Sequence, residues 1–308
     1  MRFASLIPLF FSASFIFAQE TPKTEPAAPS IDQEEARLIE LAKGLHYKEG
    51  SAELPGGIAH LDLPKGYRYL NPADAKKVVV DLWGNPPQSA SSILGMIVPA
   101  GEEIIAENSW AIVLSFKEDG YVADKDADEI DYNDLLSQLK EGNKESNKAR
   151  KAAGYETMDL KGWAVPPRYD KQNKVLYWAK QFAVPGGVED TLNYDMRVLG
   201  RRGVLSLNGI AGVSRVKDIE AATPAIVSMV QFNTGHRYAD YNSATDKEAD
   251  YSLAGLVLGG AVAAKVVAKA GLLAKIGALL LAGKKFVVLA VIGIIAFLKK
   301  LFGRKSAA

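Results

Sequence analysis

The sequence predicts an α+β domain, in which a mainly antiparallel sheet is flanked by helices, followed by a C-terminal transmembrane helical tail. Residues 158–210 contain four runs of strand composition separated by turns at 171–174, 185–187 and 200–203, and such short turns join antiparallel strands. Capping residues and apolar spacing indicate helices before and after these runs. Residues 252–302 are dominated by Leu, Val, Ile, Ala and Gly, a composition typical of a membrane segment.

The net charge of +1 is the sum of an acidic body and a basic tail. After Asp250 the sequence has nine Lys and Arg and no Asp or Glu, which leaves 28 basic against 36 acidic residues, a net charge of −8, in residues 1–250. An acidic domain disfavours a nucleic-acid partner, because a phosphate backbone requires a basic surface. The absence of cysteine excludes disulfides, thiolate metal sites and a cysteine nucleophile.

Residues 1–18 have the layout of a secretory signal peptide, with Arg2 followed by an apolar run. The sixteen uncharged residues from Phe3 to Ala18 would extend about 24 Å as a helix, short of the roughly 30 Å hydrocarbon core of a bilayer. Ile16 is large for its position before the cleavage point, so an uncleaved N-terminal anchor stays open. Residues 19–30 are rich in Pro, Ala and charge, which predicts a flexible leader to the domain at 31–250.

The domain begins with a predicted helix, because Ser30 and Gln33 form a capping-box pattern and Gly44 can end the element. Strands are expected at 58–63 and 67–70. The sequence Pro64-Lys65-Gly66 between them predicts that the two strands form a hairpin.

A second helix is predicted from Asn71, an N-cap, through Pro72 and Asp74 to Gly84. The near-continuous apolar runs 93–98 and 110–116 predict central strands that are covered on both faces.

A helix over 132–153, whose charges run from acidic to basic as the helix dipole prefers, is a candidate to cover these central strands. The meander follows, with strands at 158–165, 175–183, 191–199 and 204–210. A last helix over 216–232 contains Pro224 and is expected to break or kink there, with Thr223 as a fresh cap.

One face of the third meander strand is predicted to be apolar and the other polar. Leu192 and Met196 alternate along this strand with Asp195 and Arg197.

The tail is predicted to contain a transmembrane helix at 284–302 and a basic cytoplasmic end at 303–308, in agreement with the positive-inside rule. Residues 252–283 form an amphipathic Gly/Ala/Lys helix that lies at the interface or crosses as a second span. A buried helical hairpin of a soluble protein is the alternative. The predicted membrane anchor is bounded by Lys284, Lys285, Phe286, Leu298, Lys299 and Lys300.

No pattern in the sequence predicts a catalytic residue, a cofactor site or a metal site. Asp124, Asp126 and Asp128 are spaced as in a calcium loop, but glycine and the closing glutamate are missing from their required positions. The three histidines, His46, His60 and His236, stand far apart, without a partner at ligand spacing. A glutamate group, Glu102, Glu103 and Glu107, could act as acid and base, although a solvated loop is the simpler explanation.

The candidate interaction surface lies on the meander, where aromatic and arginine side chains concentrate. Its residues are Trp163, Tyr169, Tyr177, Trp178, Arg197, Arg201 and Arg202. Two adjacent arginines at a hairpin tip can bind an acidic partner or a lipid headgroup. Against this interpretation, aromatic residues on strands are usually core or cross-strand pairs, and Arg197 beside Asp195 indicates a local ion pair.

Several strings in this region carry a family pattern. They are G-W-A-V-P-P-R-Y-D from Gly162, L-Y-W-A from Leu176, L-N-Y-D-M-R-V-L-G-R-R-G-V-L from Leu192, and G-H-R-Y-A-D-Y-N from Gly235 with T-D-K after it. The acidic G-Y-V-A-D loop at Gly120, the export signal and the lysine-bearing tail accompany them. The chain thereby resembles the bacterial membrane-anchored proteins catalogued as domain of unknown function 2167. The resemblance implies a bacterial envelope protein and brings no catalytic residues.

We therefore expect a non-enzymatic binding or scaffold module, anchored in the bacterial inner membrane with its main domain in the periplasm. Its expected partners are membrane lipids and an envelope protein. One alternative is an envelope hydrolase that uses carboxylates not recognisable from spacing, and another is a protein that perturbs or senses the membrane through its basic tail. A deep cleft with convergent carboxylates of shifted pKa would favour the hydrolase, and a shallow apolar patch would favour the binding module.

Overall fold

The computed structural model describes residues 31–106 and 108–259. The predicted signal peptide at 1–18, the leader at 19–30, the transmembrane helix at 284–302 and the basic end at 303–308 lie outside the described residues, as does most of the segment 252–283. The chain divides into two compact units, Met1–Ala254 and Gly255–Ala308. All the strands described below belong to the first unit.

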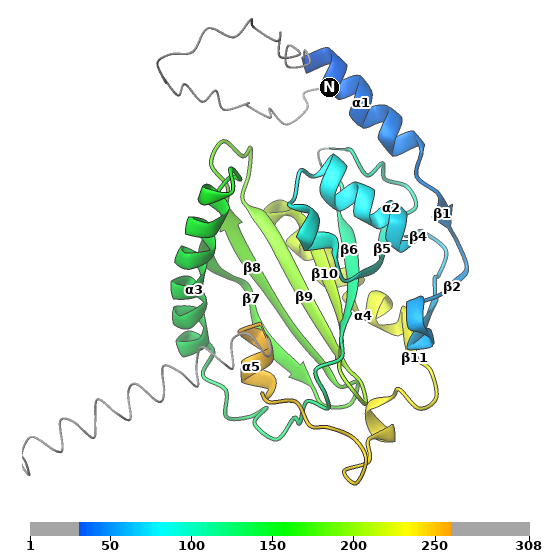
Figure 1. Cartoon of the computed structure of the whole chain (residues 1–308), viewed down its shortest axis with the longest axis vertical. Helices are drawn as coiled ribbons and strands as arrows, with labels where there is room; N and C mark the ends of the chain where they lie inside the picture. Colours follow the sequence, from blue (N-terminus) through cyan, green and yellow to red (C-terminus); the bar gives the residue numbers. More distant parts are fainter. Residues whose placement is uncertain (1–30, 107, 260–308) are drawn as a thin grey trace, which may run out of the picture. The chain divides into compact units, whose positions relative to one another are not determined.

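The first unit is built on one eight-stranded sheet in which every neighbouring pair of strands is antiparallel (Figure 1). In spatial order the strands are β1 (Tyr47–Lys48), β4 (Tyr67–Leu70), β5 (Ile93–Pro99), β6 (Ala111–Lys117), β10 (Val204–Gly212), β9 (Thr191–Leu199), β8 (Val175–Ala183) and β7 (Asp159–Asp170). Flanking helices complete an α+β fold, as the sequence predicts. The four-stranded meander is confirmed as β7 to β10.

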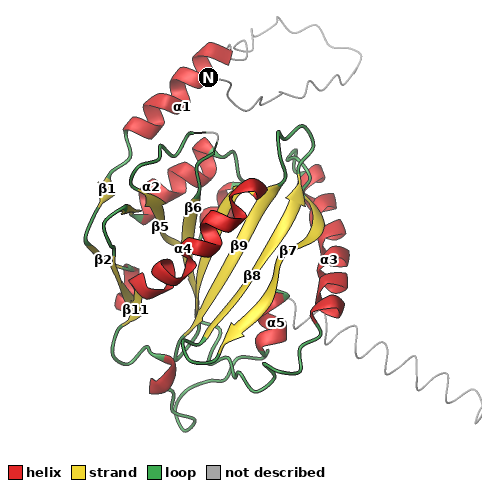
Figure 2. Cartoon of the chain, turned by 180° about the vertical axis from the view of Figure 1, so that it is seen from behind, coloured by secondary structure: helices red, strands yellow, loops and turns green. Residues whose placement is uncertain are grey.

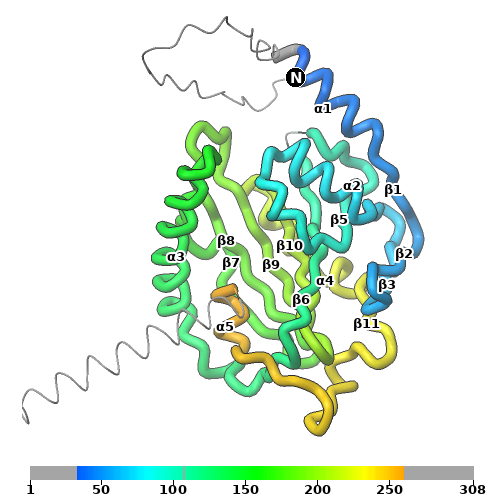
Figure 3. Tube along the Cα trace, in the orientation of Figure 1, coloured from blue at the N-terminus to red at the C-terminus, as the bar shows by residue number. Residues whose placement is uncertain are grey.

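A second sheet of three short strands has the order β11-β3-β2, with β2 at Ser51–Glu53, β3 at Ala59–Asp62 and β11 at Val230–Phe232. The predicted hairpin of β3 with β4 is wrong, because β3 pairs with β2 and β11 while β4 pairs with β1 and β5. The turn itself forms, with the Tyr67 amide donating to the Pro64 carbonyl at 3.2 Å. This turn therefore connects a strand of the small sheet, β3, to a strand of the large sheet, β4, and the two strands do not pair with each other. Figure 3 shows β11 beside the early strand β3.

The helices of the described residues are α1 (Ile31–Lys43), α2 (Pro72–Lys77), α3 (Tyr132–Ala152), α4 (Val216–Met229) and α5 (Leu253–Val257). A π-helical turn over Val78–Leu82 continues α2, and 3₁₀ turns lie at Pro55–Gly57, Pro87–Ala90, Val213–Arg215 and Tyr238–Asp240. The Asn71 cap is confirmed, since its Oδ1 accepts from the amides of Ala73 and Asp74 at 2.9 and 3.1 Å. Asp131 caps α3 in the same way.

The three helices that pack against the large sheet lie in different places. Helix α4 packs against β9 and β10, in front of the sheet in the view of Figure 2, and α2 packs on the opposite face against β5. Helix α3 follows β7 at the edge of the sheet (Figure 1), which corrects the expectation that it covers the central strands. Leu135 is the buried residue of α3, so this helix has too little apolar surface to cover a core strand.

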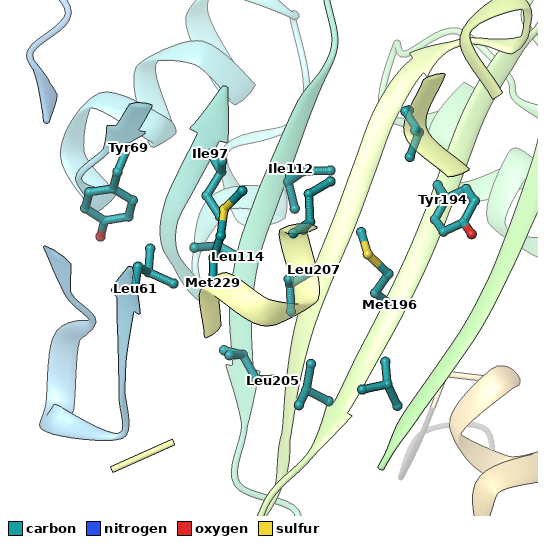
Figure 4. Packing of buried hydrophobic residues seen from close by; sticks show 14 of the residues in the cluster. Leu61, Tyr69, Ile97, Ile112, Leu114, Tyr194, Met196, Leu205, Leu207 and Met229 are labelled. Carbon is teal, nitrogen blue, oxygen red and sulfur yellow. The ribbon is translucent and has the colours of Figure 1, made fainter. Parts of the chain in front are cut away.

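The central strands are covered on both faces, as their apolar runs predict. One core lies between the large sheet, α4 and the small sheet and includes Leu61, Ile97, Met196 and Met229 (Figure 4). The other lies between α2 and β5. Its members include Leu70, Ala75, Val78, Val79, Met96 and Val98. Alternate residues of β5 therefore enter different cores.

Of the predicted break or kink at Pro224, the break is wrong, because α4 is one continuous helix from Val216 to Met229. Thr223 does not cap a new helix. Its hydroxyl donates to the Ile219 carbonyl one turn earlier at 2.7 Å, and the side chain is buried. Tertiary packing of the buried Ile219 and Met229 stabilises the helix in spite of the missing backbone donor.

Candidate functional site

Chain segments from distant parts of the sequence meet at one end of the large sheet. The strand registers place the end of β6, the β7–β8 turn and the β9–β10 turn at the same end of the strands. The segments 118–131, 171–174, 200–203 and 233–252 therefore converge there, and we call this the loop end. It contains the G-Y-V-A-D, G-R-R-G and G-H-R-Y-A-D-Y-N strings of the sequence.

Backbone hydrogen bonds fasten these segments to one another. The Gly120 amide donates to the Arg202 carbonyl at 3.0 Å, and the Arg201 amide donates to the His236 carbonyl at 2.9 Å. The Tyr121 amide donates to Lys247 O, and Tyr121 O accepts from the Ala249 amide, both at 2.9 Å. Backbone hydrogen bonds thus join three of the four segments of the loop end, 118–131, 200–203 and 233–252.

Asp124 is the centre of a polar cluster at the loop end. Its carboxylate accepts from the Tyr169 hydroxyl at 2.8 Å, from Lys174 Nζ at 2.9 Å and from the Tyr238 hydroxyl at 3.2 Å. Burial alone would raise the pKa of Asp124, but the hydrogen bonds from Lys174 and Tyr169 outweigh it and hold the pKa below its ordinary value. Burial and the bond to Asp124 raise the pKa of Tyr169. This carboxylate is an anchor for tyrosines and is ionised at neutral pH.

Three tyrosines stack beside this cluster. The Tyr121 ring lies 4.5 Å from the Tyr238 ring and 3.8 Å from the Tyr241 ring, centroid to centroid. Lys174 Nζ lies 5.1 Å from the centroid of Tyr238, within the range of a cation–π contact.

The two arginines of the β9–β10 turn have different environments. Arg201 holds Asp246 with two bonds, Nε to Oδ2 at 2.7 Å and Nη2 to Oδ1 at 3.0 Å. This pairing, together with the Asn242 backbone amide, lowers the pKa of Asp246 to about 2. Arg202 reaches the same carboxylate only at 3.6 Å, and 51% of its side chain is exposed. Arg201 is therefore structural, while Arg202 keeps donors free for a ligand.

A pocket of about 500 Å³ opens beside Arg202. It lies between the loop end, the start of β5 and the 3₁₀ turn that precedes β3. Its lining residues are Pro55, Gly56, Ile58, Ser91, Ser92, Ile93, Leu94, Phe116, Glu118, Arg202 and His236. The lining combines apolar side chains with the guanidinium of Arg202, the imidazole of His236, the carboxylate of Glu118 and two serine hydroxyls.

A second charged cluster lies on the sheet itself, around Asp195. Arg197 Nη2 and Asn208 Nδ2 donate to its Oδ1 at 2.6 and 2.7 Å, and Lys180 Nζ lies 3.2 Å from Oδ2. Burial acts to raise the pKa of Asp195, but Arg197 and Lys180 outweigh it and lower the pKa. The local ion pair expected for Arg197 is present. On the polar face of this strand, Asp195 is nevertheless buried.

The structure separates the members of the predicted interaction surface. Tyr177 and Trp178 are buried in the sheet, and Trp163 donates from its indole nitrogen to the Tyr132 carbonyl at 3.2 Å. Arg197 belongs to the Asp195 cluster. Tyr169, Arg201 and Arg202 come together at the loop end, and of these three Arg202 lines the pocket.

The other candidate groups have structural partners. In the acidic loop, Asp126 accepts from the Leu253 and Ala254 amides and Asp128 from Lys171. Nδ1 of His46 is 3.2 Å from Asp74. Nδ1 of His60 is 2.9 Å from Asn233 Oδ1, Glu102 accepts from Arg215, and Glu107 lies outside the described residues. Within residues 31–106 and 108–259, no cluster of three or more His, Asp or Glu could hold a metal ion.

Sequence reasoning missed Ser92, Glu118 and His236 as members of one pocket. The sequence holds one signal for this grouping. His236 stands in the G-H-R-Y-A-D-Y-N string, and Glu118 lies two residues before Gly120, where the G-Y-V-A-D loop begins. Their meeting depends on pairing between distant segments, which local patterns do not encode.

The predicted membrane anchor, from Lys284 to Lys300, lies outside the described residues. In the part of the chain that the structure describes, no helix has the length and apolar character needed to cross a bilayer.

The fold and the loop end define an α+β domain with an antiparallel sheet and a pocket at one end. The chain belongs to the family described as Protein of unknown function (DUF2167), whose model matches residues 46–295. No curated protein matches the sequence.

Two solved structures are similar in part. Cyanobacterial PsbP (CyanoP) from Synechocystis sp. PCC 6803 has 10% identity and a TM-score of 0.33, covering 59% of this chain and 91% of that one. The Saccharomyces cerevisiae Ran-binding protein Mog1p has 10% identity and a TM-score of 0.27, covering 59% of this chain and 84% of that one.

Proposed function

We propose that this protein is a non-enzymatic binding module of the bacterial envelope. Its tail anchors it in the inner membrane, and its α+β domain faces the periplasm and binds a partner through the pocket at the loop end. The observation that carries the proposal is the pocket, which is open, partly apolar and bordered by the half-exposed Arg202.

The electrostatic state of the carboxylates supports binding over hydrolysis. A carboxyl group that acts as a general acid needs a raised pKa. Ion pairs and hydrogen bonds instead lower the pKa of Asp124, Asp195 and Asp246. These groups hold the fold together through fixed partners.

The placement in the membrane rests on the charge distribution of the sequence. Four basic residues, Lys299, Lys300, Arg304 and Lys305, lie at or after the end of the predicted span, and Lys and Arg beside a membrane helix favour the cytoplasmic side.

The placement is testable because the chain contains no cysteine. Single cysteines replace Lys144, whose side chain is 67% exposed on α3, or Ser306 in the basic end. A membrane-impermeant maleimide should label Lys144→Cys in intact cells and Ser306→Cys only after lysis. Labelling of both positions only after lysis would place the domain in the cytoplasm and refute the proposal.

The binding role is tested by a photo-crosslinking amino acid at Ser92, which lines the pocket. We expect discrete adducts in intact cells from Ser92 and none from the same group at Lys144. Adducts that are equal at both positions, or absent at both, would contradict binding through this pocket.

A further inference from the structure

The pocket is too large for an inorganic ion and suits an organic ligand. Its volume of about 500 Å³ is many times the ~30 Å³ that one water occupies in the liquid. It lies within the roughly 300–1,000 Å³ of typical small-molecule sites. A ligand that fills it must therefore carry a body beyond any charged group.

The wall of the pocket is apolar. Ile93 is buried, and Ile58, Leu94 and Phe116 are partly buried where they pack against the main core. Their remaining exposed carbon surface is available to a hydrocarbon body, and its removal from water favours binding by roughly 25 cal/mol per Å². The wall is held by the core, so this surface is preformed.

Arg202, the cation of the pocket, has N–H groups available to bind a ligand. Arg202 is half-exposed, and its nearest carboxylate, Asp246, already receives two bonds from Arg201 at 2.7 and 3.0 Å. A guanidinium with free N–H groups binds carboxylates and phosphates through paired hydrogen bonds. His236 and Ser92 line the same pocket and add further polar groups.

Glu118 is the opposing charge of the pocket. It is an exposed residue at the end of β6, and an anionic ligand would be repelled by it. The sign of its effect on binding therefore reports the charge of the ligand.

We propose that this pocket binds an amphiphilic organic anion, with its carboxylate or phosphate group on Arg202 and its hydrocarbon body against Ile58, Leu94 and Phe116. This inference rests on the proposed binding function and names the chemical class of the ligand.

Calorimetric titration of the full chain in phosphatidylcholine nanodiscs tests the inference. The probes are hexanoate, hexyl phosphate, hexanol and inorganic phosphate. At least one hexyl anion should bind saturably, and hexanol and inorganic phosphate should bind about tenfold more weakly or worse, a loss of ~1.4 kcal/mol. The preferred anion distinguishes a carboxylate from a phosphate head. Absence of saturable binding by both anions, or equal binding of hexanol, overturns the inference.

Three variants test the direction in which each charge changes the affinity for the ligand. Arg202→Gln should weaken binding of the hexyl anion about tenfold, and Glu118→Gln should tighten it several-fold. Lys171→Gln is the control, because Lys171 is an exposed cation of the loop end that does not line the pocket; it should bind as the parent does. Arg202→Gln is expected to fold, since Arg201 keeps its bonds to Asp246, and its urea midpoint checks this. An Arg202→Gln protein that folds and binds normally overturns the inference.

The cysteine-labelling experiment separates this inference from the proposed placement. A domain found in the cytoplasm would refute the periplasmic module while leaving hexyl-anion binding to be measured. Loss of hexyl-anion binding in every arm would refute the ligand class while leaving the labelling pattern unchanged.

Discussion

Asp195 is a buried charge held by two cations that are themselves mostly covered. The side chains of Lys180 and Arg197 are 19% and 18% exposed, and that of Asp195 is 1% exposed. Asp195 is the negative charge that pairs with both cations in this cluster, since its third neighbour, Asn208, is uncharged. A carboxylate in this position orders three neighbouring strands through side-chain contacts.

Replacement of Asp195 by Asn should lower the free energy of unfolding by about 3–5 kcal/mol, since it leaves two poorly hydrated cations unpaired. Urea denaturation of the detergent-solubilised full chain measures this loss. The control Asp128→Asn removes an ion pair with Lys171 whose side chains are 80% and 61% exposed, and it should cost under about 1 kcal/mol. Equal losses in the two variants would show that the buried cluster contributes little.

Asp246 makes stability depend on acid pH. Its pKa in the folded protein is about 2, against an ordinary value of 3.8. A lowered folded-state pKa stabilises the protein fully above the unfolded value, and this stabilisation is lost as pH falls through the folded value. The urea midpoint should therefore fall between about pH 4 and pH 2. Asp246→Asn should have a lower midpoint at pH 6 and a flatter dependence below pH 4; a parallel dependence in both proteins would contradict the assignment.

Helix α3 protects the outer edge of the large sheet. Asn143 donates to the Met158 carbonyl and accepts from the Leu160 amide, at 2.8 and 2.9 Å. Asn147 donates to the same carbonyl and accepts from the Met158 amide, at 3.1 and 2.9 Å. These two side chains occupy backbone groups at the start of edge strand β7, and an edge strand otherwise offers such groups to other chains.

Replacing both Asn143 and Asn147 by Ala should lower the free energy of unfolding by about 2–4 kcal/mol, because several partly buried backbone groups lose their partners. Sedimentation velocity should also detect self-association through the freed edge of β7. Ser146→Ala on the same helix is the control, since this residue is exposed. A double variant as stable and as monodisperse as Ser146→Ala would show that the asparagines do not protect the edge.

Elements with a strong local signal could be predicted from the sequence. The meander strands follow from alternation and short turns, and the start of α2 follows from Asn71 as a cap. Strands β1, β2 and β11 could not be predicted, because two or three residues carry no measurable period. The Pro64 turn could not reveal that its strands join different sheets, since a turn has the same local chemistry in both cases. The break predicted at Pro224 does not occur, because tertiary packing overrides the low helix propensity of proline.

The candidate site could be predicted only in part, because it depends on the whole molecule. Tyr169, Arg201 and Arg202 were identified from their residue types, and all three lie at the loop end. The pocket around Arg202 also needs Ile58 and His236, which meet through pairing of β11 with β3. Composition could not exclude Trp178 and Tyr177 from a surface, because burial on a strand depends on what covers each face.

The loop end also fixes the segment that leads to the tail. Gly120 has a φ of +111°, and a Cβ there would lie 2.8 Å from Lys247 O and 2.9 Å from Ala249 N. The hydroxyl of Tyr251 donates to Asp119 at 2.9 Å. Glycine at position 120 is thus required for residues 247–249 to lie against the domain.

Gly120→Ala should loosen this segment and increase the rate of tryptic cleavage after Lys247 about tenfold, which corresponds to ~1.4 kcal/mol of local stability. Gly101→Ala is the matched control, because its added Cβ would meet no atom within 4 Å. Mass spectrometry of timed digests gives both rates. Unchanged cleavage in Gly120→Ala would mean that the segment does not depend on this close approach.

The pairing of β11 with β3 has a consequence for the newly synthesised chain. The side chains of His60 and Asn233 meet across 173 residues of sequence. A ribosome that adds about 5–20 residues per second needs roughly 9 to 35 s to make that length. During this interval β3, which includes the apolar residue Leu61, lacks the neighbouring strand with which it later pairs. We therefore expect the nascent polypeptide to present β3 to chaperones that bind apolar segments until translation passes residue 232.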